Sequence, residues 1–208
     1  MNSARTLNGT ATRVDPSDQQ QHRTRNVLSV MRSVFERTVE NGTSLDSVAA
    51  HYRGRFDTLA AFLTGSGMDD DGTYDLETLV WNELLRFPAE AGGVVEVSGP
   101  PVRLPHDQAQ PIALAIHELA TNAVKFGALG PISRGRIDVQ WVCDGADIVL
   151  TWRETGSAIL MAAPARRGFG RTFIEEGLPY QIGAETGFAF GPGSVTGTFK
   201  FTIDQPRA

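Results

Sequence analysis

The sequence is poor in three features: it has one cysteine, no long apolar run and no sustained run of basic residues. The single Cys143 excludes an internal disulfide, and its place in an apolar, alternating stretch predicts a buried structural thiol in a reducing compartment. No segment approaches the ~20 apolar residues of a membrane span, and the polar N-terminus lacks the apolar core of a signal peptide. We therefore expect a cytoplasmic protein without a membrane segment.

The charge balance is mildly acidic. The 208 residues include 19 Lys and Arg against 24 Asp and Glu, a formal net charge of -5, and the basic residues are scattered along the chain. This distribution argues against a sequence-independent nucleic-acid surface. A hydrophobic content of 41% is enough for a sizeable core. The composition predicts a globular protein of one larger or two small domains, with no nucleic-acid partner.

The N-terminal third predicts a helical hairpin. Residues 1–18 have few large apolar groups and several turn formers, so we expect a disordered segment there. Apolar residues at helical spacing then predict helices from about 20 to 40 and from about 43 to 63, which form a hairpin over 19–66. Their apolar faces are too wide for one partner, so a four-helix bundle in a homodimer is expected. The second helix presents these apolar positions: Leu45, Val48, Ala49, Tyr52, Phe56, Leu59, Ala60 and Leu63.

The small, acidic segment 64–72 predicts a domain boundary, followed by a second domain over 73–208. Two alternating runs, IDVQWVC and DIVLTWRE, are separated by Asp144-Gly145 and predict a β-hairpin. Strands combined with helices on one face imply an α+β sandwich. The other expected elements are helices near 75–87, 108–126 and 170–177, and strands near 94–97, 186–190 and 197–203.

His22 lies on the polar side of the first expected helix. An exposed histidine on its own carries little information. In QHRTRN, however, Arg25 and Asn26 follow it by about one turn, and such groups suit an incoming phosphoryl group through charge-assisted hydrogen bonds. The alternative is a solvated helix start without function.

The segment HELATNAVKFGAL places Glu118, Asn122 and Lys125 along one strip of a helix. A carboxylate and an amide four residues apart can present oxygens to Mg²⁺, which usually takes only one or two protein ligands besides phosphates and water. Lys125 can neutralise phosphate charge as a mobile cation. The alternative is a solvated helix face with no particular partner.

Two glycine-containing segments add possible nucleotide contacts. In RRGFGRTF, Gly168 and Gly170 flank Phe169 before a helix, where backbone N-H groups can meet phosphate. In WRETG, Glu154 can accept the amine of adenine, and Gly156 lets the backbone pass close by. Neither a Rossmann fingerprint nor a P-loop is present.

Taken in order, QHRTRN, HELATNAVKFGAL, WRETG and RRGFG resemble the histidine kinases of the HWE class, over about residues 20–204. The resemblance implies a dimerisation and histidine phosphotransfer hairpin followed by an ATP-binding domain of the GHKL or Bergerat type. It implies ATP and Mg²⁺ as cofactors and the receiver domain of a response regulator as partner. The implied activity is autophosphorylation on a histidine and transfer to an aspartate of that regulator.

The resemblance also implies roles for individual residues. His22 matches the phosphoacceptor, Asn122 the Mg²⁺ ligand, and Glu118 the acid that contacts the metal or assists transfer. His117 and Trp152 support the site, with core packing expected for Trp152. The residues implied to bind nucleotide are Asn122, Lys125, Glu154, Gly156, Arg167, Gly168 and Gly170.

The match is incomplete in two places. Gly156-Ser157 stands where paired glycines are expected, and we expect no sensor domain in the residues before His22. The input is therefore expected from a separate sensor or from a longer kinase of which this chain is the transmitter part. Two rival interpretations stay open: a Bergerat-fold serine kinase of the anti-sigma type, which lacks the N-terminal hairpin, and a non-catalytic phosphotransfer or scaffold protein with a degenerate ATP-binding domain.

Overall fold

The computed structural model describes four continuous stretches and part of a helical segment before them. The stretches are 44–87, 93–130, 135–156 and 168–203. Between 29 and 39, the described residues are all helical, and they are Ser29, Met31, Arg32, Val34, Phe35, Glu36, Thr38 and Val39. His22, Arg25, Asn26, Ser157 and Arg167 lie outside the described residues.

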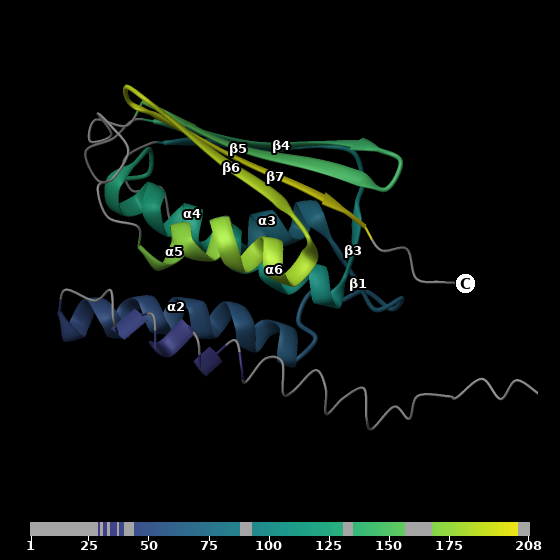
Figure 1. Cartoon of the computed structure of the whole chain (residues 1–208), viewed down its shortest axis with the longest axis horizontal. Helices are drawn as coiled ribbons and strands as arrows, with labels where there is room; N and C mark the ends of the chain where they lie inside the picture. Colours follow the sequence, from purple (N-terminus) through teal and green to yellow (C-terminus); the bar gives the residue numbers. More distant parts are fainter. Residues whose placement is uncertain are drawn as a thin grey trace, which may run out of the picture.

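A five-stranded sheet forms the top layer of the molecule in the orientation of Figure 1. Its strand order is β2-β4-β5-β7-β6, with β2 parallel to β4 and all other pairs antiparallel. The expected hairpin around Asp144-Gly145 is present, and Gly145 adopts a φ of 62°, which favours glycine. The strands are β2 Val94–Ser98, β4 Arg136–Asp144, β5 Asp147–Thr155, β6 Glu185–Gly191 and β7 Ser194–Thr202.

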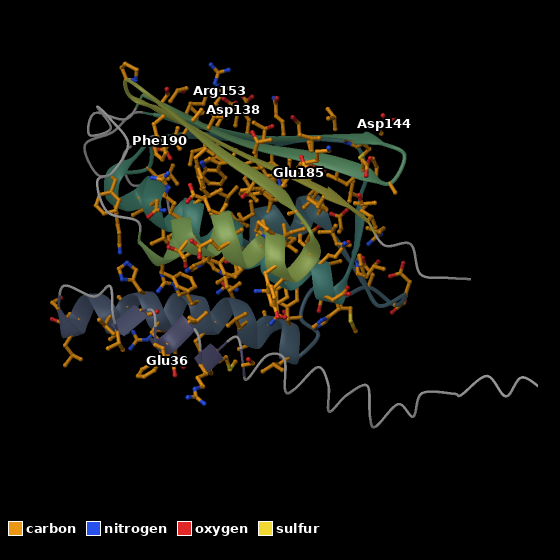
Figure 2. The ribbon with its side chains drawn as sticks, viewed as in Figure 1. Glu36, Asp138, Asp144, Arg153, Glu185 and Phe190 are labelled. Atoms are coloured by element: carbon orange, nitrogen blue, oxygen red, sulfur yellow. The ribbon has the colours of Figure 1, made fainter. Side chains whose placement is uncertain are left out.

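Helices cover one face of this sheet, which confirms the expected mixed α+β arrangement (Figure 1). Asp138 and Arg153 point away from the helices on the other face (Figure 2), whereas their strand neighbours Ile137 and Trp152 are fully buried. The helix expected near 170–177 is longer and is divided into three consecutive parts. The covering helices are α3 Leu76–Leu84, α4 His106–Phe126, and the series α5 Phe169–Thr172, η1 Phe173–Gly177 and α6 Leu178–Ile182.

A second, two-stranded sheet joins the starts of α3 and α4. Strand β1 Thr73–Asp75 pairs antiparallel with β3 Arg103–Pro105. Asp75 also caps α3, since its carboxylate accepts a 2.9 Å hydrogen bond from the Thr78 amide. The sequence did not predict this sheet, because three residues are too few to show an alternating pattern.

Helix α2, Leu45–Leu63, forms a third layer on the side of the helices remote from the sheet (Figure 1). Its buried residues are Arg55, Thr58, Leu59 and Phe62, and they face α4 and its neighbours. Several of the apolar positions predicted for this helix are exposed in the single chain, among them Leu45 at 83%, Phe56 at 42% and Leu63 at 47%. The inward face of α2 is therefore partly polar, and much of its apolar face is uncovered.

One prediction about burial was wrong. Cys143 is exposed, although it continues the inward-facing series of Ile137, Val139 and Trp141 on β4. From Val142 onward both faces of this strand are exposed, so the alternating pattern extends beyond the part of the sheet that is covered. Among the described residues, no helix is both long enough and apolar enough to cross a membrane.

Candidate functional site

Helix α4 lies at the centre of the helical layer and contacts α2, α3, α5 and α6. Every residue from Gln108 to Ala120 is buried, including the polar His117 and Glu118. Exposure begins in the next turn, with Asn122 and then Lys125 and Phe126. The polar strip predicted from the sequence is thus divided between a buried acid and two exposed groups.

Glu118 forms a buried ion pair with Arg55 of α2. The Arg55 Nε donates to one carboxylate oxygen at 2.6 Å, and its Nη2 donates to the other at 2.8 Å. Glu118 is only 3% exposed. A two-point guanidinium-carboxylate pair of this kind is directional and charge-assisted. The interpretation of this part of the strip as a solvated helix face is therefore wrong, because Glu118 has a buried partner 63 residues away in the sequence.

His117 takes part in a second buried polar cluster. Its Nδ1 lies 3.1 Å from Glu83 Oε2 on α3, and the Thr58 hydroxyl of α2 donates to the same oxygen at 2.9 Å. The Phe87 ring lies 5.4 Å from the imidazole, centroid to centroid. Adjacent residues of α4 thus make separate polar contacts with α2.

Glu154 lies at the end of β5, beside the C-terminal end of α4. Its Oε1 accepts a 2.8 Å hydrogen bond from the backbone N-H of Ala128, and the carboxylate is buried. Burial raises the pKa of Glu154, while the hydrogen bond from Ala128 partly opposes this shift. Gly127 packs so closely that a Cβ at that position would overlap the same oxygen.

The glycines predicted from the sequence to contact nucleotide occupy different structural positions. Gly156 follows β5 with a φ of 78°, a left-handed conformation that favours glycine. Gly170 packs against Glu118, so that a Cβ there would lie 2.7 Å from Oε2. Gly168 precedes α5 with open space around its Cα. The segment at 168–170 and the strip on α4 are therefore neighbours in space.

Asn122 and Lys125 remain accessible on the last turns of α4. Although Lys125 is exposed at the surface, loss of hydration around its ammonium group lowers its pKa. The described residues contain no group of three His, Cys, Asp or Glu side chains that could enclose a metal ion. Asn122 still suits Mg²⁺, which needs few protein ligands, whereas both oxygens of Glu118 are engaged by Arg55.

The sequence interpretation missed Arg55, Thr58 and Glu83. One signal was present: Arg55 follows Tyr52 by three residues and precedes Leu59 by four, which places a charged side chain beside the expected apolar stripe. No comparable signal marks Glu83. Its partners come from α2 and α4, so its role depends on tertiary packing.

Comparison with known proteins agrees with this arrangement. Residues 20–101 match the family model of the HWE histidine kinases. A blue-light-activated histidine kinase of Erythrobacter litoralis is 30% identical over 190 residues, 89% of this chain and 52% of the relative. Another blue-light-activated histidine kinase, from Rhizobium johnstonii, is 31% identical over 155 residues, 74% of this chain and 43% of the relative. The chain therefore spans about half the length of these curated relatives.

A solved structure shares the fold. The histidine kinase domain of a blue-light-activated histidine kinase from Erythrobacter litoralis superposes with a TM-score of 0.63, at 18% identity and with 89% of both chains covered. The curated relatives are histidine kinases, and the chain resembles them over most of its own length. Within this class, the chain resembles the HWE histidine kinase family, whose model matches its residues 20–101.

Proposed function

We propose that this chain is the phosphotransferring part of a two-component histidine kinase, which phosphorylates His22 with Mg²⁺-ATP and passes the phosphoryl group to an aspartate of a response regulator. The observation that carries the proposal is the gathering of three separated motifs around the C-terminal half of α4. Asn122 and Lys125 lie exposed on it, Glu154 is hydrogen-bonded to the loop that follows it, and Gly170 packs against Glu118.

In this proposal, these residues contact different parts of a bound nucleotide. The buried carboxylate of Glu154 provides an acceptor for the exocyclic amine of adenine, next to the left-handed backbone of Gly156. Lys125 and the backbone around Arg167, Gly168 and Gly170 meet the phosphates. Asn122 holds Mg²⁺, with Glu118 as a second ligand or as an assisting acid once it is released from Arg55; the metal ion neutralises phosphate charge when it is bound.

The transfer needs a neutral imidazole and an in-line approach. A ring nitrogen of His22 attacks the γ-phosphorus, the bond to the bridging oxygen breaks, and ADP leaves with that electron pair. The regulator's aspartate then takes the phosphoryl group and restores the imidazole. Positioning and charge neutralisation supply most of the rate, because the protein has little covalent work to do in this reaction.

Assembly as a homodimer fits the uncovered apolar side chains of the helical segment and α2. Phe35, Val39, Leu45, Phe56 and Leu63 are all more than two fifths exposed. We therefore propose that the hairpin, residues 19–66, pairs with a second copy as a four-helix bundle, and that residues 73–208 form the Bergerat-type domain. A cytoplasmic location and a separate or longer sensor complete the proposal.

Labelling with γ-³²P-ATP and Mg²⁺ tests the activity and the acceptor together. The expected product is an acid-labile, base-stable label that is absent from His22→Ala and retained in the control His51→Ala. A label that persists in His22→Ala would contradict the assignment of the acceptor. An unlabelled wild-type protein that still binds a receiver domain would favour a non-catalytic phosphotransfer or scaffold protein, and an acid-stable label would favour the serine kinase.

A further inference from the structure

Arg55 connects α2 to two elements of the proposed nucleotide site. Its Nε and Nη2 hold both oxygens of Glu118, at 2.6 and 2.8 Å. Its guanidinium also lies over the ring of Phe169 at the start of α5, 3.9 Å from the ring centroid. Figure 1 shows α2 running beneath α4 and α5, so one arginine spans the junction of all three helices.

The pair is buried, with described residues on two of its sides. The remaining terminal nitrogen of Arg55, Nη1, donates to the hydroxyl of Thr38 at 2.5 Å. On the opposite side, Gly170 leaves no room for a side chain next to Glu118 Oε2. With both members nine-tenths or more buried, the carboxylate is out of reach of a hydrated metal ion, and the guanidinium places a positive charge where a cation would otherwise lie.

A second contact one turn along α2 reinforces the first. Thr58 follows Arg55 by three residues and bonds to Glu83, which also contacts His117. Since His117 and Glu118 are consecutive, α2 is attached to the same turn of α4 at two points. Gly54 completes the fit, because a Cβ at that position would lie 2.8 Å from His117 Nε2.

From these contacts we infer that Arg55 serves as an internal cation for Glu118, so that α2 holds the chain in an autoinhibited arrangement in which this carboxylate is withheld from the nucleotide and its metal ion. The inference rests on the proposed function of Glu118. A buried ion pair suits a reversible contact: its attraction is largely offset by lost hydration, and both ions regain water when the surfaces separate. Nucleotide binding and closure of α2 therefore oppose each other.

Two substitutions open the contact by different means. Arg55→Gln removes the cation, and the exposed Arg53→Gln makes the same chemical change on the same helix as a matched control. Gly54→Ala changes no charge and raises the intrinsic preference for helix, so any opening comes from the clash with His117. Its ring is held between Glu83 and Phe87 and has little freedom to move aside.

The separation of α2 from the sheet is measured between spin labels. Cys143 is exposed on β4 and is the only cysteine of the sequence, so a single added thiol, Ala50→Cys on the exposed side of α2, gives one labelled pair. Electron-electron double resonance is expected to give a narrow distance distribution in the parent and in Arg53→Gln. Arg55→Gln and Gly54→Ala are expected to shift it to longer, broader distances, and Mg²⁺ with trinitrophenyl-ATP is expected to do the same in the parent.

Binding of trinitrophenyl-ATP with Mg²⁺ is followed by its fluorescence in the same four proteins. Arg55→Gln and Gly54→Ala are expected to bind about tenfold more tightly than the parent and Arg53→Gln, because the closed state no longer competes. Equal affinities in all four, or unchanged label distances, would overturn the inference while leaving the proposed function intact. If none of the four bound the analogue, the proposed function would fail, and the distance changes alone would still support α2 as a closing contact.

Discussion

The two ends of the polar strip on α4 differ in what surrounds them. At residues 117–118, both side chains are buried and tied to α2, through Thr58 and Glu83 in one case and Arg55 in the other. At residues 122–128, the side chains of Asn122 and Lys125 are exposed, and the loop after the helix is bonded to β5. One helix thus carries a contact between layers and an accessible site within two turns.

The difference teaches that helical spacing does not by itself define a common environment. Glu118 and Asn122 lie on one strip, yet only the first is covered, because α2 crosses α4 at that turn. A residue in the covered half can act in catalysis only after the layers separate, whereas one in the open half can bind a ligand directly. Substitutions in the two halves should therefore have different consequences for activity and stability.

The largest expected effect comes from the open half. Asn122→Ala should lower ATP-dependent labelling by about 100-fold or more, as for loss of a group that acts directly at a reacting centre. Because Asn122 is exposed, the free energy of unfolding should change by less than ~0.5 kcal/mol. Labelling rates and urea denaturation measure the two effects, with the exposed amide Gln181→Ala on α6 as control. Full activity in Asn122→Ala would show that this part of α4 is an ordinary solvated helix face.

Sequence periodicity was sufficient for most of the fold. The helices at α2, α3 and α4, the β4-β5 hairpin and the helices on one face of the sheet all follow from local patterns. The short β1-β3 pair was missed because three residues carry no period, and Cys143 was misplaced because its strand extends beyond the covered sheet. These failures arise where tertiary packing decides the environment.

The candidate site was predictable in its residue types but not in its pairing. The sequence indicated Glu118, Asn122, Glu154 and Gly170 as a set, and the structure brings their elements together around α4. The partner of Glu118 could not be found in the same way, because Arg55 belongs to another layer and no local pattern couples two helices so far apart in sequence. His22 remains a sequence prediction.

An intermediate effect is expected where α4 meets β5. Gly127→Ala would drive a methyl group into Glu154 Oε1 and against the backbone of Ala123, so either the carboxylate or the end of the helix must shift. Overpacking of this kind typically costs about 1–3 kcal/mol of stability. Urea denaturation should show this loss, while Gly187→Ala on β6, which has open space around its Cα, should change stability by less than ~0.5 kcal/mol. Equal stabilities of the two variants would show that the junction is loosely packed.

The smallest expected effect is a change in the pH dependence of stability. Burial raises the pKa of Glu154 above its value in the unfolded chain, so the folded protein binds more protons between the two values. The contribution of Glu154 to the free energy of unfolding is therefore fully present below its pKa in the unfolded chain. It is lost as the pH rises through its pKa in the folded protein, with a slope of at most ~1.4 kcal/mol per pH unit. Glu154→Gln keeps an acceptor for Ala128 but cannot ionise, so its stability relative to wild type should improve as the pH rises from about 4 toward neutrality.

Urea denaturation across this range measures the difference, and the exposed Glu185→Gln should not reproduce it. A parallel curve for Glu154→Gln and wild type would mean that water reaches this carboxylate and that burial does not raise its pKa.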